Sequence, residues 1–423
     1  MISIPLTRHE LSNGLTVVLA PDSAVPIVAV NVWYKVGSRN EREGRTGFAH
    51  LFEHMMFQGS AHVPKGGHFE LLEAAGGSMN GSTWFDRTNY FETLPAHELD
   101  LALWLEADRM GWLLPAVDQE KLDNQRDVVK NERRQRYENQ PYGDWDERMQ
   151  ALLYPPDHPY HHTVIGSMAD LSAASLEDVE AFFRTYYQPG NAVLTLAGDF
   201  DPADAFSRVE RYFGDIPPGA PVPPVPGRTD IDAVIGGTVR DEVRAAVPLP
   251  RVYVGVRIPP YTDSDFHAAD VASSVLGDGR ASRLYRRLVR EKRVAKDVVA
   301  YAAPLVTGRA FMILWATGFP GTDATELERA VAEELEALGD VEPAEVERAV
   351  TRSETQLVQE IEQLSSRADR LSMHQTIFGD ASHLTQEIEH LRRVTAADVG
   401  AFARSSLGPD NRAVVVYLPE GKR

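Results

Sequence analysis

Two histidines and a glutamate lie close enough along the chain to bind a metal ion together. Residues 48–59 read FAHLFEHMMFQG, in which Glu53 and His54 follow His50 by three and four positions. In a helix, these spacings place the three side chains on one face. Two neutral imidazoles on one turn can bind zinc at about 2.0–2.1 Å, and the carboxylate then lies beside the open coordination position. This is the H-x-x-E-H arrangement of the inverted zinc proteases.

The alternative is that both histidines are ordinary polar residues on an exposed helix face. The chain contains 13 histidines among 423 residues, so a chance H-x-x-E-H has a probability on the order of a few per cent. The motif alone is therefore only suggestive. Because catalytic zinc takes three protein ligands, a third one has to be found elsewhere in the chain.

A helix is predicted for the segment that carries the motif. Thr46 can cap its start, and the side chains around the candidate ligands are apolar enough to pack the rest of its surface. These apolar residues are Phe48, Leu51, Phe52, Met55 and Met56.

A candidate third ligand lies in the segment LDNQRDVVKNERRQRYENQPYG, which reads as a helix ended by Pro141 and Gly143. Glu132 follows Val128 by four positions and Val129 by three, so we expect it on their inward face. A carboxylate on a buried face needs a partner, and a cation is a natural one. Asp127 and Glu138 remain as alternatives.

Composition restricts the class of protein in which such a site would lie. A chain of 423 residues is expected to form two or more domains. The net charge of −19 argues against nucleic-acid binding. The chain has no cysteine, so disulfides and cysteine metal ligands are excluded. Neither a signal peptide nor a run of 18 apolar residues is evident. We therefore expect no membrane association and a cytoplasmic location, or a periplasmic or secreted one if a leader was removed.

The chain divides near its middle into two halves of similar pattern. Six prolines in residues 214–230 predict an extended connector. Each half begins with an alternating strand, at 26–37 and 250–260, and ends with another, at 191 and 411. Long charged helices are expected at 323–338 and 342–374. We predict an α+β fold produced by duplication, with domains at 1–214 and 231–423 joined by a linker at 215–230.

Several motifs together resemble the pitrilysin/insulinase (M16) family of zinc metallopeptidases, and in particular the branch of mitochondrial processing peptidase and its bacterial relatives. The resemblance covers nearly the whole chain, in the expected order. It rests on LSNGLTVVLAPD, VGSRNEREGRTGFAHLFEHMMFQGS, GGSMNGSTWFDRTNYFETLP, VVKNERRQR, NAVLTLAGDFDP and GDGRASRLYRRLVRE. It implies two homologous α/β-sandwich domains of the LuxS/MPP-like metallohydrolase type.

The resemblance also implies roles for the residues that match the family motifs. His50, His54 and Glu132 match the ligands of one zinc ion per chain, and Glu53 matches the general base. Zinc would polarise the scissile carbonyl and acidify a water molecule, and Glu53 would take the proton from that water. The implied function is a zinc-dependent endopeptidase that cleaves peptides or unfolded segments inside a clamshell chamber formed by two chains.

The segment around residue 80 resembles the family's substrate-binding strand. Its edge would pair with a peptide backbone as an added β-strand. Asn80, Gly81 and Ser82 are the candidate substrate-binding residues, and Gly81 stands where many relatives have alanine. The alternative is an ordinary edge strand.

Two departures from the family bear on activity. Gln125 replaces a glutamate that many relatives carry seven residues before the third ligand, and we expect this to weaken the hydrogen bonds around Glu132. Active relatives also supply an arginine and a tyrosine from the partner half. Arg290 matches the arginine, but Lys296 or Asp297 stands where the tyrosine is expected. We therefore expect a dimer. One form is a heterodimer whose other subunit supplies the arginine–tyrosine pair, and the alternative is an active homodimer.

The second half lacks its own H-x-x-E-H, since the equivalent positions are Ala272 and Leu276. We therefore expect it to bind no zinc. Two further functions remain open from the sequence. One is a non-catalytic structural subunit like the respiratory-complex core proteins, and the other is a dedicated protease that matures a single peptide precursor.

Overall fold

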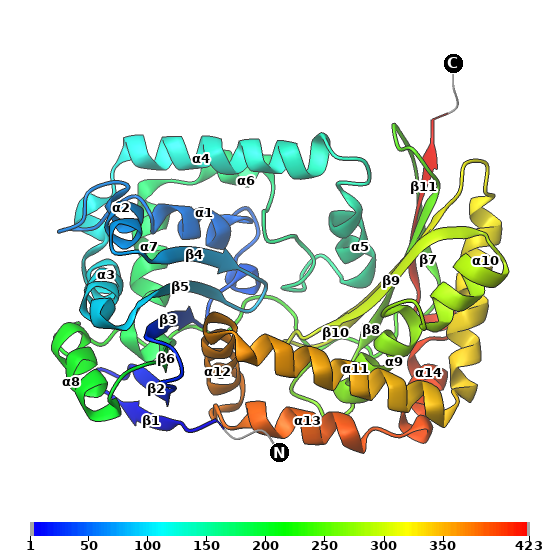
Figure 1. Ribbon diagram of the computed structural model, residues 1–423. Helices are drawn as coiled ribbons and strands as arrows, with labels where there is room; N and C mark the ends of the chain where they lie inside the picture. Colours follow the sequence, from blue (N-terminus) through cyan, green and yellow to red (C-terminus); the bar gives the residue numbers. More distant parts are fainter. Residues whose placement is uncertain (1–3, 421–423) are drawn as a thin grey trace. The chain divides into compact units, whose positions relative to one another are not determined.

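Two β-sheets with the same strand order organise the chain (Figure 1). The structure is a computed structural model that describes residues 4–420. The first sheet has the order β1-β2-β6-β3-β5-β4, and the second has the order β7-β11-β8-β10-β9. In both sheets one pair is parallel, β2 with β6 and β7 with β11, and the remaining pairs are antiparallel.

The strands lie close to where alternation of apolar residues predicts them. In the first sheet they are β1 (Thr7–Glu10), β2 (Thr16–Pro21), β3 (Ile27–Tyr34), β4 (Ser78–Thr83), β5 (Thr88–Pro95) and β6 (Ala192–Gly198). In the second they are β7 (Val239–Ala245), β8 (Arg251–Ile258), β9 (Ala295–Ala303), β10 (Ala310–Gly318) and β11 (Ala413–Pro419). Apart from β1, each strand of the first sheet has a counterpart at the same place in the second. The predicted duplication and the α+β class are confirmed.

The chain divides into two compact units, one around each sheet. The first unit contains residues up to Glu132, Val164–Pro226 and Val358–Glu387. The second contains Arg133–Thr163, Gly227–Leu357 and residues from Ile388 onward. One boundary, between Pro226 and Gly227, falls within the predicted linker. The two predicted domains, 1–214 and 231–423, nevertheless need correction, because each half of the chain gives one segment to the unit of the other half.

Helices accompany the strands in both units, and those of the first unit come first. They are α1 (Phe48–Met55), α2 (Gly67–Ala74), α3 (Leu99–Trp112), α4 (Gln119–Arg133), α6 (Met168–Ala173), α7 (Leu176–Tyr186), α8 (Pro202–Phe213), α12 (Leu364–Phe378) and the first residues of α13 (His383–Arg393). In the second unit they are α5 (Trp145–Leu153), α9 (Phe266–Gly277), α10 (Ala324–Ala337), most of α11 (Pro343–Glu362) and α14 (Ala396–Ser406), together with π-helical turns at Arg134–Glu138 and Tyr285–Glu291.

Helix α12 comes from the second half of the chain but packs on β3 and β6 of the first sheet (Figure 1). Its Asp369 carboxylate accepts hydrogen bonds from Trp33 Nε1 at 2.7 Å and Asn89 Nδ2 at 2.9 Å. Ser372 Oγ donates to Thr195 Oγ1 at 2.7 Å. These bonds satisfy polar groups inside the first unit, which explains why α12 belongs to it.

Helix α5 makes the reciprocal exchange, from the first half of the chain to the second sheet. Trp145 stacks on Tyr253 of β8, with ring centroids 4.9 Å apart. Arg148 pairs with Asp241 of β7 at 2.8 Å, and Arg257 Nε donates to the Leu153 carbonyl at 2.7 Å. Local sequence patterns cannot reveal such an exchange, because it depends on which sheet leaves an apolar face uncovered.

One predicted helix is wrong in extent. Residues 342–374 form two helices, α11 and α12, separated at Gln363, whose backbone is extended (φ −82°, ψ 125°). The division of the chain between the two units falls nearby, after Leu357. Within residues 4–420, no helix combines the length and apolar character needed to cross a membrane.

Candidate metal centre

Helix α1 carries the H-x-x-E-H segment and is anchored by its apolar side. Leu51, Phe52 and Met55 are fully buried, and the Phe52 ring lies 4.4 Å from that of Tyr187, between centroids. The predicted apolar residues Phe48 and Met56 are buried as well. Burial of this face leaves the opposite face of the helix, with both histidines and the glutamate, free to form a site.

The N-terminus of α1 is held by carboxylates from outside the helix. The predicted cap Thr46 is wrong: Gly47 is the N-cap, and Thr46 Oγ1 instead donates to Asp170 Oδ2 at 2.6 Å. The Glu41 carboxylate accepts hydrogen bonds from the amides of Gly47 at 2.9 Å and Ala49 at 2.7 Å. Gly47 has φ of 82°, and a Cβ there would lie 2.3 Å from the Ile165 carbonyl oxygen. Only glycine therefore fits this turn.

Helix α4 presents Glu132 on its inward side. Leu122, Gln125 and Val129 are buried and lie on one face with Glu132, at helical spacing. The prediction that Val128 shares this face is wrong, because 41% of its surface is exposed. The alternative ligands Asp127 and Glu138 are both exposed.

The fold brings His50, His54 and Glu132 together. Their candidate ligand atoms all lie within 4.8 Å of one another, and among residues 4–420 this is the one such group of three. Glu132 Oε2 is 3.7 Å from His50 Nε2 and 3.5 Å from His54 Nε2. Ligand atoms around tetrahedral zinc, with bonds of 2.0–2.1 Å, lie about 3.4 Å apart. The donor set of two imidazoles and one carboxylate fits zinc in both chemistry and size.

Glu53 is held next to this group by a threonine that no spacing in the sequence pointed to. Thr83 Oγ1, at the end of β4, donates to Glu53 Oε2 at 2.5 Å. Burial raises the pKa of Glu53, while the Thr83 hydrogen bond and the nearby His54 and Arg87 act in the opposite direction. The chain thus supplies both a partly desolvated carboxylate and groups that stabilise its charged form.

Arg87 lies near this carboxylate, at the edge of the sheet. Its guanidinium donates to the Ser82 carbonyl at 2.8 Å and to Ser82 Oγ at 2.5 Å. Burial lowers the pKa of Arg87, and the charges of Asp369 and Glu53 oppose that shift. Arg87 is half-buried, and its hydrogen bonds to Ser82 hold the end of β4 beside the candidate site.

The candidate substrate-binding residues lie on β4, at the edge of the first sheet. Within the described residues β4 pairs on one side only, with β5. Asn80 is exposed, and its Oδ1 accepts from the Gly81 amide at 2.9 Å. A Cβ at Gly81 would lie 3.1 Å from the Phe57 ring, so alanine would need a small shift of that ring. Ser82 Oγ donates to Asn89 Oδ1 at 2.7 Å.

Gln125 is 6% exposed and lies two turns before Glu132 on α4. Its side-chain amide donates to Asn124 Oδ1 at 3.0 Å. This hydrogen bond of the Gln125 side chain is thus made to its neighbour in sequence, Asn124, and not to Glu132.

The second unit differs at the equivalent positions. Ala272 and Leu276 are fully buried on α9. Arg290 is exposed on the π-helical turn Tyr285–Glu291, and Lys296 is exposed on β9. Asp297 accepts a hydrogen bond from Thr317 Oγ1 at 2.8 Å, so its carboxylate is used within the sheet.

Three residues that hold the site were not predicted from the sequence: Glu41, Thr83 and Arg87. Each lies within a quoted motif, but nothing in its spacing distinguishes it from its neighbours. An acidic residue shortly before a helix that starts at glycine was the one available signal, for Glu41.

Comparison with known proteins agrees with this fold. The model of the insulinase family, peptidase family M16, matches residues 16–153, and the model of the peptidase M16 inactive domain matches residues 173–353. The chain is 32% identical to the zinc protease PqqE of Helicobacter pylori, over 98% of this chain and 93% of that protein. It is 23% identical to the uncharacterized zinc protease YmxG of Bacillus subtilis, over 98% and 99% of the two chains.

Solved structures show the same architecture. The crystal structure of a protease from Helicobacter pylori matches with a TM-score of 0.92 and 29% identity, over 99% of this chain and 100% of that chain. The structure titled peptidase M16 inactive domain, from Pseudomonas fluorescens, shares the fold with a TM-score of 0.86 at 17% identity, over 99% of both chains. Since both halves match family models and the identity to one zinc protease extends over nearly the whole chain, this chain belongs to the insulinase family, peptidase family M16.

Proposed function

We propose that the protein is a zinc-dependent endopeptidase that acts on peptides or unfolded segments. The observation that carries this proposal is the convergence of His50, His54 and Glu132 within 4.8 Å, with Glu53 on the same helix face. The zinc proteases among the relatives support it. Such an ion, when bound, would polarise a scissile carbonyl and lower the pKa of water toward about 7.

The residues of this chain would then divide the remaining work. His50, His54 and Glu132 would hold the ion. Glu53, kept in place by Thr83, would accept a proton from water and pass it to the departing amine. The free edge of β4 would pair with the substrate backbone, which would make recognition depend weakly on side chains.

Peptide hydrolysis and zinc content of two variants test this division. Glu53→Gln should retain zinc, measured by mass spectrometry of the metal, and lose hydrolysis of quenched-fluorescent peptides by at least a hundredfold. Glu132→Gln should weaken zinc binding by at least a hundredfold, measured by competition with a chromogenic chelator. Asp127→Asn, on the exposed side of the same helix, is the matched control and should leave both properties unchanged. A fully active Glu53→Gln protein would refute the assignment.

A second proposal concerns the groups that would stabilise the negative charge on the substrate's carbonyl oxygen during cleavage. Lys296, which is exposed on β9, or its neighbour Asp297 stands where the family resemblance places a tyrosine. We propose that a homologous subunit supplies the arginine–tyrosine pair and that cleavage takes place in a chamber between the two chains. Zinc-loaded protein that does not cleave peptides alone, but does so with a homologous partner, would support this proposal. Robust Glu53-dependent cleavage by the purified chain would oppose it.

A further inference from the structure

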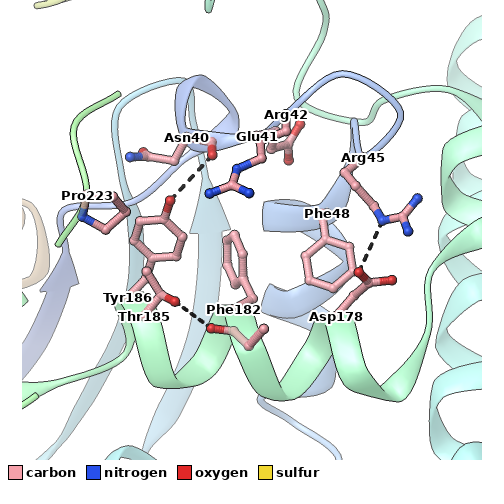
Figure 2. A pocket seen from close by; sticks show the side chains of 11 residues that line it. Asn40, Glu41, Arg42, Arg45, Phe48, Asp178, Phe182, Thr185, Tyr186 and Pro223 are labelled. Carbon is pink, nitrogen blue, oxygen red and sulfur yellow. Dashed lines mark hydrogen bonds and ion pairs between the residues drawn. The ribbon is translucent and has the colours of Figure 1, made fainter. Parts of the chain in front are cut away.

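The first unit contains a pocket that uses none of the candidate zinc ligands. It lies between the loop that precedes α1 and one face of α7, and its volume is about 220 Å³ (Figure 2). Asp178, Phe182 and Tyr186 of α7 face it at helical spacing, as does Phe48 at the start of α1.

Three aromatic rings form the apolar floor. The Phe182 ring is 5.2 Å from that of Phe48 and 4.9 Å from that of Tyr186, between centroids. Each of the three residues is less than 10% exposed. The Tyr186 hydroxyl donates to the Asn40 carbonyl at 3.5 Å, so its polar end is directed toward the rim (Figure 2). Such a floor favours a flat apolar group, and aromatic rings in particular.

The acidic groups on the rim are already engaged. The Glu41 carboxylate holds the start of α1 through the amides of Gly47 and Ala49. Asp178 pairs with Arg45 at 3.2 Å and also accepts a hydrogen bond from Ser175. Neither carboxylate is therefore free to attract a cation into the pocket.

Arg42 differs from these groups. Within residues 4–420 its side chain makes no ion pair or hydrogen bond, and it is exposed. Figure 2 shows its guanidinium turned into the pocket, toward Phe182. Its charge acts on the Tyr186 hydroxyl, where it lowers a pKa that burial raises. The pocket therefore combines an apolar floor with one uncommitted positive charge.

We propose that this pocket binds a small aromatic monocarboxylate, with the carboxylate on Arg42 and the ring on Phe48, Phe182 and Tyr186. A planar guanidinium pairs with a carboxylate through two parallel hydrogen bonds, which suits Arg42. A cavity of about 150 Å³ holds benzene, so a pocket of about 220 Å³ accommodates one ring with a short acidic arm. The same chemistry occurs in a free aromatic acid and in the last residue of a peptide that ends in phenylalanine.

Isothermal titration of the full-length Glu53→Gln protein tests the proposal independently of peptidase activity. The probe is 3-phenylpropionate, and we expect a dissociation constant on the order of 1 mM or lower, as for other ligands of this size. Arg42→Gln should weaken binding at least tenfold. Arg184→Gln, an exposed arginine of α7 that pairs with Glu180 and does not line the pocket, is the matched control and should change affinity less than twofold.

Three further measurements distinguish binding in this pocket from binding at the metal or elsewhere on the protein. The neutral 3-phenylpropionamide should bind at least tenfold more weakly, because it lacks the charge that Arg42 recognises. Affinity for 3-phenylpropionate should persist after zinc is removed with a chelator, which excludes binding of the carboxylate to the metal. Ala181→Phe, which fills the pocket from the exposed side of α7, should abolish binding while the protein remains folded.

N-acetylphenylalanine distinguishes the two sources of the ligand. Affinity equal to or higher than that of 3-phenylpropionate would indicate the end of a peptide, and much lower affinity would indicate a free acid. Equal affinity of wild-type and Arg42→Gln protein, or no binding at 10 mM probe, would overturn the proposal. Loss of peptidase activity in Glu132→Gln would leave it unaffected, so the proposed function and this pocket fail or succeed separately.

Discussion

Glu41 should control how well helix α1 presents its histidines, although it lies outside the helix. Its carboxylate is 7% exposed and accepts hydrogen bonds from the first amides of α1, those of Gly47 and Ala49. These amides have no partner within the helix, and a negative charge next to them interacts favourably with the helix dipole. His50 lies in the same first turn. Glu41→Ala should therefore loosen the turn that carries one candidate zinc ligand.

The magnitude follows from the bonds that are lost. A hydrogen bond to a charged group contributes about 1.5–3 kcal/mol, and buried amides left without a partner add to the loss. We expect Glu41→Ala to destabilise the first unit by about 3 kcal/mol. Glu41→Gln keeps an acceptor for only one of the two amides and loses the charge, so a loss of about 2 kcal/mol is expected. If half of the 3 kcal/mol is lost from the metal-binding conformation of α1, zinc binding weakens by about 1.5 kcal/mol. Zinc affinity then falls about tenfold, since 1.4 kcal/mol corresponds to a factor of ten.

Two measurements on the same samples test this reasoning. Urea unfolding followed by circular dichroism gives the stability, and competition with a chromogenic chelator gives the zinc affinity. Glu43→Ala, an exposed acidic residue of the same loop, is the control and should change neither. Zinc affinity and unfolding midpoint of Glu41→Ala within error of the wild type would show that α1 does not depend on this carboxylate.

Further expectations concern charge and metal in the first unit. Arg109 is fully buried and pairs with Glu106 and Glu92, so Arg109→Leu should cost about 3–5 kcal/mol in urea unfolding, and an unchanged midpoint would contradict this. Burial, aided by Arg109, lowers the pKa of His68 to about 4. As the pH falls, the imidazole of the unfolded chain therefore takes up a proton before that of the folded protein does. The free energy of unfolding that neutral His68 contributes above pH 6.5 should fall by roughly 3 kcal/mol between pH 6.5 and 4. His68→Gln should flatten that part of a pH series of unfolding curves. Chelation of zinc should lower the unfolding temperature of wild-type protein, by the equivalent of about 4 kcal/mol if free zinc was a thousand times its dissociation constant. In His50→Ala the same treatment should have little effect.

Short-range patterns in the sequence determined the parts of the site that depend on one helix. The spacing of His50, Glu53 and His54 places them on one face whatever surrounds the helix, because the α-helical repeat is a property of the backbone. Alternation in β3 and β8 predicted both central strands for a similar reason. The duplication was visible because both halves repeat the same order of elements.

The tertiary structure decided what depends on contacts between distant segments. It brought Glu132, and not Asp127 or Glu138, next to the two histidines, and it placed Glu41 rather than Thr46 at the start of α1. These choices depend on which side of a helix is covered by other elements, and a local pattern does not contain that information.

The exchange of α5 and α12 between the two units has the same origin. The sequence determined that helices would form at these positions, because their apolar periodicity is local. Only the folded chain determined which sheet each helix covers, since the energy gained comes from burying a sheet face and satisfying Asp369 or Arg148 there. The sequence by itself therefore specified the candidate histidine ligands and the secondary structure, and long-range packing decided the candidate third ligand, the support of α1 and the composition of each unit.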